Sequence, residues 1–573
     1  MIGRGWAIFC VAGLAALSGC QLFVEDADRQ VYKLIEERQS QALSMHTDAG
    51  IHKERVPKSV PSTAYDHVPS PTDPTIPGSM QSTSRPSTQP LTPPTSQAIL
   101  GASSRPASVT TMQLNDALAY AFRHARRFQT AKEDLYLAAL ALTLERHMWG
   151  PRFMSSVQME YANYGQIRDF DHAMRAVADV AVEQRLPYGG EVTAKVVNTL
   201  MRDLGRRITT SESGQTILEA NIPLLRGAGR AARESRYQAE RGLIYAARTF
   251  ERFRRAFAVE VANGFIELLR QKQEIANVKS SYRRFLADAE RSRALCDAGR
   301  LIELEAQRAE QELLGAWNQV VNAEEQYRQG VERFKILIGM PMLEPLDVVG
   351  AQLDAVVPLV VPTVDQKAVL EIAVRRRLDL INERDAIDDA RRGVGVARNN
   401  LLPDLNLRGN VTFDTNPNEL EQFHYEHERA TWRAFADLEI PLDRVEERNA
   451  YRSQLIELRR AERRYDLAMD QVRLDVRQAR RQIDQALTSL SIQKQSMELA
   501  LRQREAADFR FEQGVGISNR EIVDAENNLL NARDRVAGAE SGLRRAILAF
   551  YLDAGMIRVD DEGKLLDLAA PNR

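Results

Sequence analysis

Cysteine and long apolar segments are scarce in this sequence of 573 residues. Its three cysteines are Cys10, Cys20 and Cys296, which cannot build a disulfide framework, and Cys296 has no partner for a metal site. No segment after residue 20 is apolar for about 18 residues, so we expect no transmembrane helix in the remainder of the chain. The formal net charge of −2 gives no indication of a nucleic-acid partner.

Catalytic motifs are absent as well. The sequence contains no nucleophile elbow, P-loop, HExxH or CxxC motif, and its eight histidines form no constellation. We therefore expect no enzymatic activity, no catalytic cofactor and no resident metal. His424 and His427 lie among acidic residues, where a solvated loop is the simpler interpretation than a metal site.

What the sequence does contain is helix of unusual length. From Leu442 to about Gln513 there is neither proline nor glycine. Two apolar seams repeat every seven residues along this segment: Leu458, Tyr465, Val472, Ala479 and Ala486, and Met469, Val476, Ile483, Leu490 and Met497. This spacing predicts a coiled coil. Roughly 70 residues at about 1.5 Å each give about 100 Å of helix, which indicates a role in spanning a distance.

The start of the chain resembles a bacterial lipoprotein signal. Arg4 precedes an apolar segment over 6–17, and Leu17-Ser18-Gly19-Cys20 resembles a lipobox. Residues 1–19 are predicted to be a signal peptide and Cys20 the lipid attachment site, with a plain signal peptide as the alternative. Gln21 in place of aspartate favours the outer membrane. A short helical region over 20–54 and a disordered linker over 55–110, rich in proline, serine and threonine, are expected to follow.

The sequence of the remainder of the chain indicates an internal duplication. With a shift of 252 residues, Pro151 falls on Pro403, and each half contains a helix, β segments, a very long helix, a turn and a long helix. The predicted repeats cover 111–340 and 365–556, with a connector over 341–364 and a C-terminal tail over 557–573.

Alternating β segments lie within 153–224 and within 404–441. Their period of two suits tilted transmembrane strands, and a soluble half-buried hairpin has the same pattern. The first half carries 34 additional residues between Pro151 and Pro223, which predict an added hairpin turning at Pro187-Tyr188-Gly189-Gly190. Neither four nor six strands close a barrel, so several chains are required.

Taken together, these features make the chain resemble the TolC-like outer-membrane efflux proteins. The resemblance rests on residues 373–407 (AVRRRLDLINERDAIDDARRGVGVARNNLLPDLNL), on the corners NIPLLRGAGRAA and EIPLDRVEE, and on residues 511–536 (FEQGVGISNREIVDAENNLLNARDRV). It implies a mainly α fold with a transmembrane β-barrel part, in which duplicated antiparallel helical hairpins form an α-barrel in a homotrimer. It also implies four strands per chain and twelve in the trimer. If the added hairpin joins the barrel wall, the chain supplies six strands and the trimer eighteen.

In this family, acidic residues after the last hairpin turn narrow the periplasmic mouth. The matching positions are Glu521 and Asp524, with Arg520 beside them. The i, i+3 spacing places both carboxylates on one helix face, and threefold symmetry would gather them into rings. An ordinary solvated helix start is the alternative. The first half has Glu305 and Arg308 instead, so the repeat is not symmetric here.

Gly227-Ala228-Gly229 with Ala232 fits a dinucleotide fingerprint, but no parallel strand returns after the helix, so a tight corner is expected.

The predicted function is a passive outer-membrane exit duct of a tripartite efflux or type I secretion system. The implied partners are a periplasmic adaptor, an inner-membrane pump of RND, ABC or MFS type, and outer-membrane lipid. The alternative is a lipid-anchored periplasmic coiled-coil scaffold or adaptor. The sequence does not specify the substrate.

Overall fold

The structure is a computed structural model that describes residues 20–43, 110–163, 172–203, 210–350, 353–359, 365–415, 430–512 and 519–566. Four predicted features lie outside these residues: the signal peptide, most of the linker, the loop with His424 and His427, and the turn at 514–516. In the part of the chain that is described, no helix combines the length and the apolar character needed to cross a membrane.

Helices and strands follow one another in an order that repeats. The elements up to the end of the first long hairpin are α2 (Cys20–Leu43), β1 (Thr110–Met112), α3 (Leu114–His124), α4 (Arg126–Met148), β2 (Arg152–Asn163), β3 (His172–Arg185), β4 (Glu191–Asp203), β5 (Thr210–Pro223), α5 (Glu234–Asp297) and α6 (Glu303–Ile338). Those that follow are β6 (Leu346–Val348), α7 (Leu353–Val356), α8 (Gln366–Arg376), α9 (Leu378–Asn399), β7 (Asp404–Asp414), β8 (Thr431–Glu439), α10 (Val445–Glu512) and α11 (Asn519–Asp553).

The internal repeat extends to details of the backbone. Helices α3 and α8 begin at Leu114 and Gln366, which are related by the shift of 252. Each helix is interrupted at the related residues Ala125 and Arg377, which have extended backbone and separate α3 from α4 and α8 from α9. Strands β1 and β6, which precede α3 and α7, pair in parallel and join the two halves.

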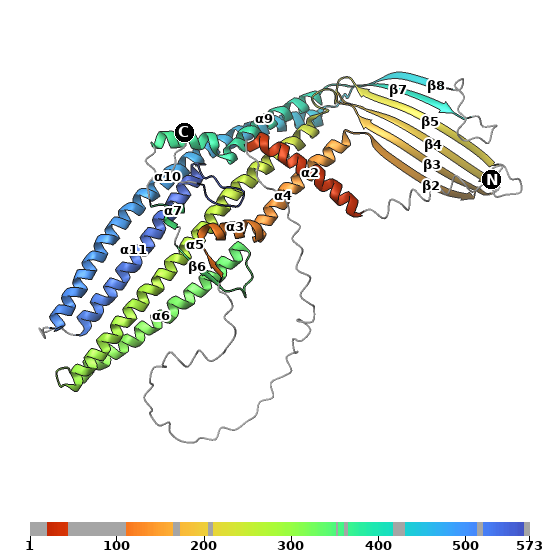
Figure 1. Cartoon of the computed structure of the whole chain (residues 1–573). Coiled ribbons are helices and arrows are strands. Elements are labelled where there is room, and N and C mark those ends of the chain that lie inside the picture. The colour runs from red at the N-terminus through yellow and green to blue at the C-terminus, as the bar shows by residue number, and fades with distance from the viewer. Residues whose placement is uncertain are drawn as a thin grey trace, which may run out of the picture.

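Two antiparallel helical hairpins extend away from one end of a sheet (Figure 1). One consists of α5 and α6, with 64 and 36 residues, and the other of α10 and α11, with 68 and 35 residues. Helices α5 and α11 are in contact, so the four helices form one curved layer in the order α6, α5, α11, α10. The predicted seams of α10 are confirmed, because Val472, Val476, Ala479, Ile483 and Leu490 are all buried.

Helix α2 packs across α4 and α5 near the sheet (Figure 1). Val31, Leu34 and Ile35 are buried in the main apolar core of the first repeat. The Tyr136 hydroxyl on α4 donates a hydrogen bond of 2.5 Å to Asp28, and Arg38 lies 3.2 Å from the Glu240 carboxylate on α5. Burial and the nearby Asp28 carboxylate raise the pKa of Tyr136, so its hydroxyl stays protonated.

The sheet contains six antiparallel strands in the order β2-β3-β4-β5-β7-β8. The expectation of four strands is therefore wrong for this chain, and the alternative of six holds. Directly opposed residues share a face of the sheet. One apolar row crosses all six strands through Phe153, Val182, Ala194, Leu218, Val411 and Trp432. The next row is polar and contains Arg152, Glu183, Thr193, Glu219, Asn410 and Arg433.

The turn between β3 and β4 docks on the corner where β5 leads into α5. The Gly229 amide donates a hydrogen bond of 2.8 Å to the Tyr188 carbonyl oxygen. Gly227 and Gly229 have φ of 77° and 69°, a conformation that glycine adopts without strain, so the tight corner is confirmed. Asn399 lies at the end of α9. Its side chain accepts a hydrogen bond of 2.7 Å from the Gly227 amide and donates one of 3.0 Å to the Leu225 carbonyl oxygen.

We expect Gly190→Ala to destabilise the sheet. Gly190 has φ of 85°, and a Cβ there would overlap the Asn221 carbonyl and lie 2.8 Å from Cδ of Pro223. The expected loss is about 1–3 kcal/mol, measurable as a lower midpoint in thermal unfolding followed by circular dichroism. The control is Gly242→Ala on α5, where a Cβ meets no atom within 4 Å and should stabilise the helix by about 0.5–1 kcal/mol. Equal midpoints for the two variants would contradict the docked turn.

Candidate functional site

The candidate gate lies at the far end of the second hairpin, where α11 begins at Asn519 (Figure 1). Ile522, Val523 and Ala525 are buried against neighbouring helices, whereas Glu521 and Asp524 are exposed. The helical period therefore separates an apolar contact face from an acidic solvent face. Both predicted carboxylates lie on this exposed face, one turn apart.

Arg520 is the nearest basic group in the predicted set. Its Nε lies 3.8 Å from Oδ2 of Asp524, and the side chains are 82% and 64% exposed. Such an exposed pair contributes at most about 1 kcal/mol, so Arg520 is held only weakly beside Asp524. At the matching position of the first hairpin, Arg308 pairs with Glu305 at 2.7 Å.

Small apolar layers hold the helices together behind the gate. Ala507 on α10 packs with Ile522 and Ala525 on α11, and Phe285 on α5 packs with Ala316 and Val523. Alanine in these layers allows the helix axes to approach closely.

A buried charge network lies between these layers and links three helices. Glu526 on α11 is fully buried. Its two carboxylate oxygens accept hydrogen bonds from Arg284 Nε at 2.7 Å and from Arg504 Nε at 3.2 Å. Arg504 on α10 also donates to Asp288 on α5 at 3.0 Å and pairs with Asp508. The network joins α5 to both helices of the second hairpin within a few turns of its tip.

Burial changes the acidity of this network. It raises the pKa of Asp288 above its usual 3.8, and the positive charge of Arg504 opposes the shift only in part. Farther from the tip, burial also raises the pKa of Asp534, which accepts a hydrogen bond of 2.8 Å from Asn277. The contact of Asp288 with α10 and the contact of Asp534 with α5 are therefore sensitive to protonation.

The sequence analysis missed this network, although a signal was present. Arg504 continues the seam of Met469, Val476, Ile483, Leu490 and Met497 by one heptad. A charged residue at a seam position requires a partner of opposite charge when it is buried. Its partner Glu526 lies between Ile522 and Leu529 in the apolar seam of α11.

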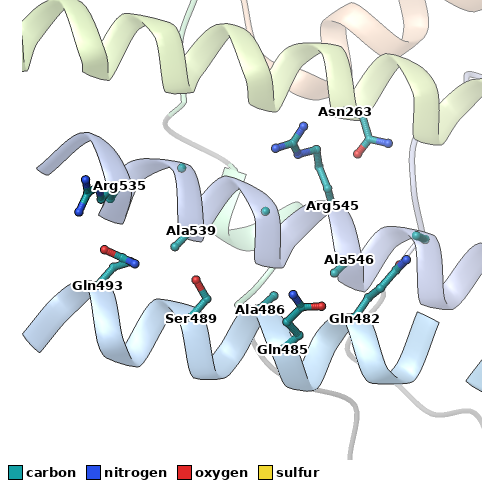
Figure 2. Close-up of a pocket in the computed structure, with 13 residues that line it drawn as sticks. Asn263, Gln482, Gln485, Ala486, Ser489, Gln493, Arg535, Ala539, Arg545 and Ala546 are labelled. Carbon is teal, nitrogen blue, oxygen red and sulfur yellow. The ribbon is translucent and has the colours of Figure 1, made fainter. Parts of the chain in front are cut away.

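An open groove of about 730 Å³ crosses the second hairpin nearer the sheet (Figure 2). Its floor is α11 with Gly538, Gly542 and Ala546, and its walls carry Gln482, Gln485, Ser489 and Gln493 from α10 and Asn263 from α5. Figure 2 shows Arg545 and Asn263 extending into the space between α11 and α5. The opposite face of α11 packs Leu543, Ile547 and Phe550 with Val369 and Ala373 of α8, so the groove opens away from α8.

No candidate metal site accompanies these features. Across the described segments, no group of three or more His, Cys, Asp or Glu side chains could hold a metal ion. Cys296 is a free, partly buried thiol near the end of α5.

Solved structures of outer-membrane channels share the fold of this chain. A structure of CusC, a protein described as forming a transmembrane channel, has 14% identity and a TM-score of 0.60 over 78% of this chain and 92% of that one. The outer membrane protein VceC from Vibrio cholerae has 14% identity and a TM-score of 0.59, covering 77% and 96%. The Campylobacter jejuni CmeC outer membrane channel has 14% identity and a TM-score of 0.57, covering 77% and 85%. At this identity the likeness concerns the fold.

Residues 369–555, which comprise most of the second repeat, match the family model described as outer membrane efflux protein. No curated protein sequence matches the chain significantly. Residues 369–555 therefore resemble the outer membrane efflux proteins within a fold shared with the solved channels, and the resemblance to the TolC-like proteins is confirmed.

We expect Glu526→Gln to loosen the distal end of the second hairpin. Removing the buried charge takes the carboxylate from Arg284 and one of three from Arg504, which should lower the local opening free energy by at most about 3–5 kcal/mol. Hydrogen exchange of peptides from α10 and α11 measures this change. The matched control is Glu540→Gln, whose exposed pair with Lys494 at 3.3 Å should contribute at most about 1 kcal/mol. Equal exchange in both variants would show that the network does not hold the helices.

Asp288 should make this region more stable in mild acid. Because its pKa is raised in the folded state, the folded chain binds more protons than the unfolded chain between that pKa and about 3.8. Its contribution to the free energy of unfolding therefore increases as the pH falls through this window. Thermal midpoints of wild type and Asp288→Asn between pH 7 and pH 4 test this, since the wild type should gain more stability than the variant, in which Asp534 still titrates. Parallel curves would refute it.

Proposed function

We propose that this chain is the passive outer-membrane exit duct of a tripartite efflux or type I secretion system. The observation that carries the proposal is the six-stranded sheet with one apolar and one polar face, continuous with helices about 100 Å long. A sheet of this kind suits a membrane barrel with a polar interior, and the helices suit a tube that crosses the periplasm. The outer membrane efflux protein domain supports the same assignment.

The open edges of the sheet support assembly from several copies. β2 and β8 each pair on one side only, and their directions allow β8 of one chain to pair antiparallel with β2 of the next. A homotrimer would then contain eighteen strands and a ring of helices in which α10 of one chain meets α6 of its neighbour. Exposed apolar residues on these two helices, including Leu467 and Leu474 on α10 and Leu314 and Trp317 on α6, fit this contact.

Exposed carboxylates at the start of α11 support a gate at the periplasmic mouth. Three copies of Glu521 and Asp524 would form two acidic rings, with Arg520 at their rim. The network of Arg504 and Glu526 behind these rings would fix the position of α11 in each chain. Opening would then require movement of the second hairpin relative to α5.

Anchoring and energy would come from outside the folded body. A lipid on Cys20, at the start of α2, would hold the chain at the outer membrane. An inner-membrane pump of RND, ABC or MFS type, joined through a periplasmic adaptor, would supply the energy, because the proposed duct carries out no reaction of its own.

Single-channel conductance in planar bilayers tests this function and the gate together. The wild type should form a small cation-selective pore, because the acidic rings attract cations and narrow the mouth. Glu521→Gln/Asp524→Asn should conduct more and lose selectivity. The control is again Glu540→Gln, which removes an exposed carboxylate of α11 far from the tip.

Each outcome bears on a different part of the proposal. If the double variant and the wild type behave identically, the duct stands and the gate assignment fails. If the purified, lipidated oligomer never conducts, the duct itself is refuted and a periplasmic scaffold becomes the better interpretation.

A further inference from the structure

We infer that Leu343 and Glu344, in the turn after α6, insert into a pocket between α8, α9 and α10 of a neighbouring copy of this chain. The inference rests on the homotrimer of the proposed duct, and it names the segment that fastens one copy to the next. The observation that carries it is a pair of related pockets, of which one is filled within the chain and the other is open.

Each repeat contains a small pocket at the break in its first helix. The first-repeat pocket lies where α3 meets α4, measures about 250 Å³, and its lining includes Phe122, Arg123, Phe128 and Lys132. The second-repeat pocket lies where α8 meets α9, measures about 200 Å³ and is lined by Val374, Arg375, Leu380, Ile381, Arg384 and Tyr465. The shift of 252 residues pairs the four named residues of the first pocket, in order, with Val374, Arg375, Leu380 and Arg384. The two pockets are therefore equivalent, and each combines apolar walls with two basic side chains.

The C-terminal turn over residues 557–566 fills the first-repeat pocket. It crosses from the end of α11 to the first repeat, where Val559 is buried in the main apolar core. Arg254 on α5 donates hydrogen bonds of 3.1 and 3.2 Å to the carbonyl oxygens of Val559 and Asp560. The acidic tip of the turn, Asp561 and Glu562, lines the pocket beside its basic side chains. An apolar residue followed by acidic residues is thus the kind of segment that this pocket accepts.

The second-repeat pocket has no such cover within one chain. Among the described residues, its lining comes from α8, α9 and α10 alone. Arg384 is exposed there, whereas its counterpart Lys132 in the covered pocket is only 4% exposed. Arg375 is exposed as well. The open pocket therefore presents an apolar floor and two positive charges to the surroundings of the chain.

The segment equivalent to the C-terminal turn follows α6. Gly339 after α6 and Gly555 after α11 have φ of 79° and 67°, and a Cβ on each would meet His124 and Arg376, respectively, which the shift of 252 relates. Counted from these glycines, Leu343 corresponds to Val559 and Glu344 to Asp560. Val559 is 1% exposed, but Leu343 is 98% exposed. Leu343 thus holds the position of a buried residue without being buried by its own chain.

Hydrogen bonds hold the turn after α6 in shape. Nζ of Lys335, a buried residue of α6, donates a hydrogen bond of 3.1 Å to the Met342 carbonyl oxygen. The Glu344 amide donates one of 3.3 Å to the Pro341 carbonyl oxygen. Leu343 is therefore presented on an ordered turn, which reduces the entropy that its insertion into a pocket would cost.

A neighbouring copy can bring this turn to the open pocket, and the same chain cannot. Helices α6 and α10 form opposite edges of the four-helix layer, so Leu343 and the pocket beside α10 lie on opposite sides of one chain (Figure 1). Within the chain, the C-terminal turn passes from α11 to the adjoining α5. In the proposed ring, α6 adjoins α10 of the next copy in the equivalent way, so the turn after α6 would reach the second-repeat pocket there. Leu343 would then contact the apolar floor, and Glu344 would face Arg375 and Arg384.

Disulfide trapping in the full-length, lipidated protein tests this contact. The variant Leu343→Cys/Val374→Cys is made in a Cys296→Ser background, which removes the free thiol of α5. A disulfide requires Cβ atoms within about 4.5 Å of each other, so oxidation of the membranes should convert most of the protein to covalent trimers on a denaturing gel. The control is Leu343→Cys/Leu402→Cys, since Leu402 is an exposed leucine at the opposite end of α9, beside the sheet. This control should remain monomeric on the gel.

A charge exchange tests the part assigned to Glu344. Arg375→Glu in the Leu343→Cys/Val374→Cys chain should slow formation of the covalent trimer roughly two- to fivefold, because it places like charges together at an exposed contact. Adding Glu344→Arg should restore the rate. A chain with both exchanges that reacts as slowly as Arg375→Glu alone would overturn the assignment of Glu344.

The outcomes separate this contact from the proposed duct. If the variant conducts in planar bilayers and is trimeric by native mass spectrometry but gives no covalent trimer, the contact is refuted and the duct stands. A disulfide within one chain, or a covalent product with a different protein, would also overturn the inference, because the pocket would then have another occupant. If the wild-type protein is monomeric and never conducts, the proposed duct and the contact fail together.

Discussion

Hydrogen bonding along the two open edges of the sheet is the constraint on which the rest of the structure depends. Inside a membrane, no water replaces a missing backbone partner, so a sheet with an apolar face cannot leave β2 and β8 unpaired there. In the proposed duct, further copies of the chain would satisfy both edges at once. Assembly would then be a condition of the fold, and the long hairpins would be brought together because the strands above them must close.

The helical part is held by two kinds of contact with different consequences. Apolar seams such as Val476 and Ile483 provide most of the burial, but similar seams would also tolerate a shift of one heptad. The buried network of Arg504, Glu526 and Asp288 adds little net stability, because desolvation offsets much of its attraction. Its geometry is satisfied in one alignment of α5, α10 and α11, so it defines the register of the helices at the end where the proposed gate lies.

The sequence predicted features that depend on local spacing and missed those that depend on distant partners. Heptad spacing alone predicted the seams of α10, and the 252-residue shift predicted the repeated order of elements. The turn at Pro187 to Gly190 predicted a hairpin, but its place in the sheet depends on pairing between strands far apart, as between Gln215 and Asp414. Arg504 and Glu526 were overlooked because their partners on α5 lie more than 200 residues away.

The related helix breaks at Ala125 and Arg377 carry a consequence for stoichiometry. A closed ring of duplicated chains presents twice as many quasi-equivalent helical hairpins as there are subunits. The sheet does not share this property, because the first repeat contributes four strands and the second two. In the proposed ring, hairpin tips with Glu521 and Asp524 would alternate with tips in which Arg308 pairs with Glu305. A partner docking there would meet a pseudosymmetric ring whose successive positions differ in their side chains, so two partner molecules per subunit would occupy inequivalent places.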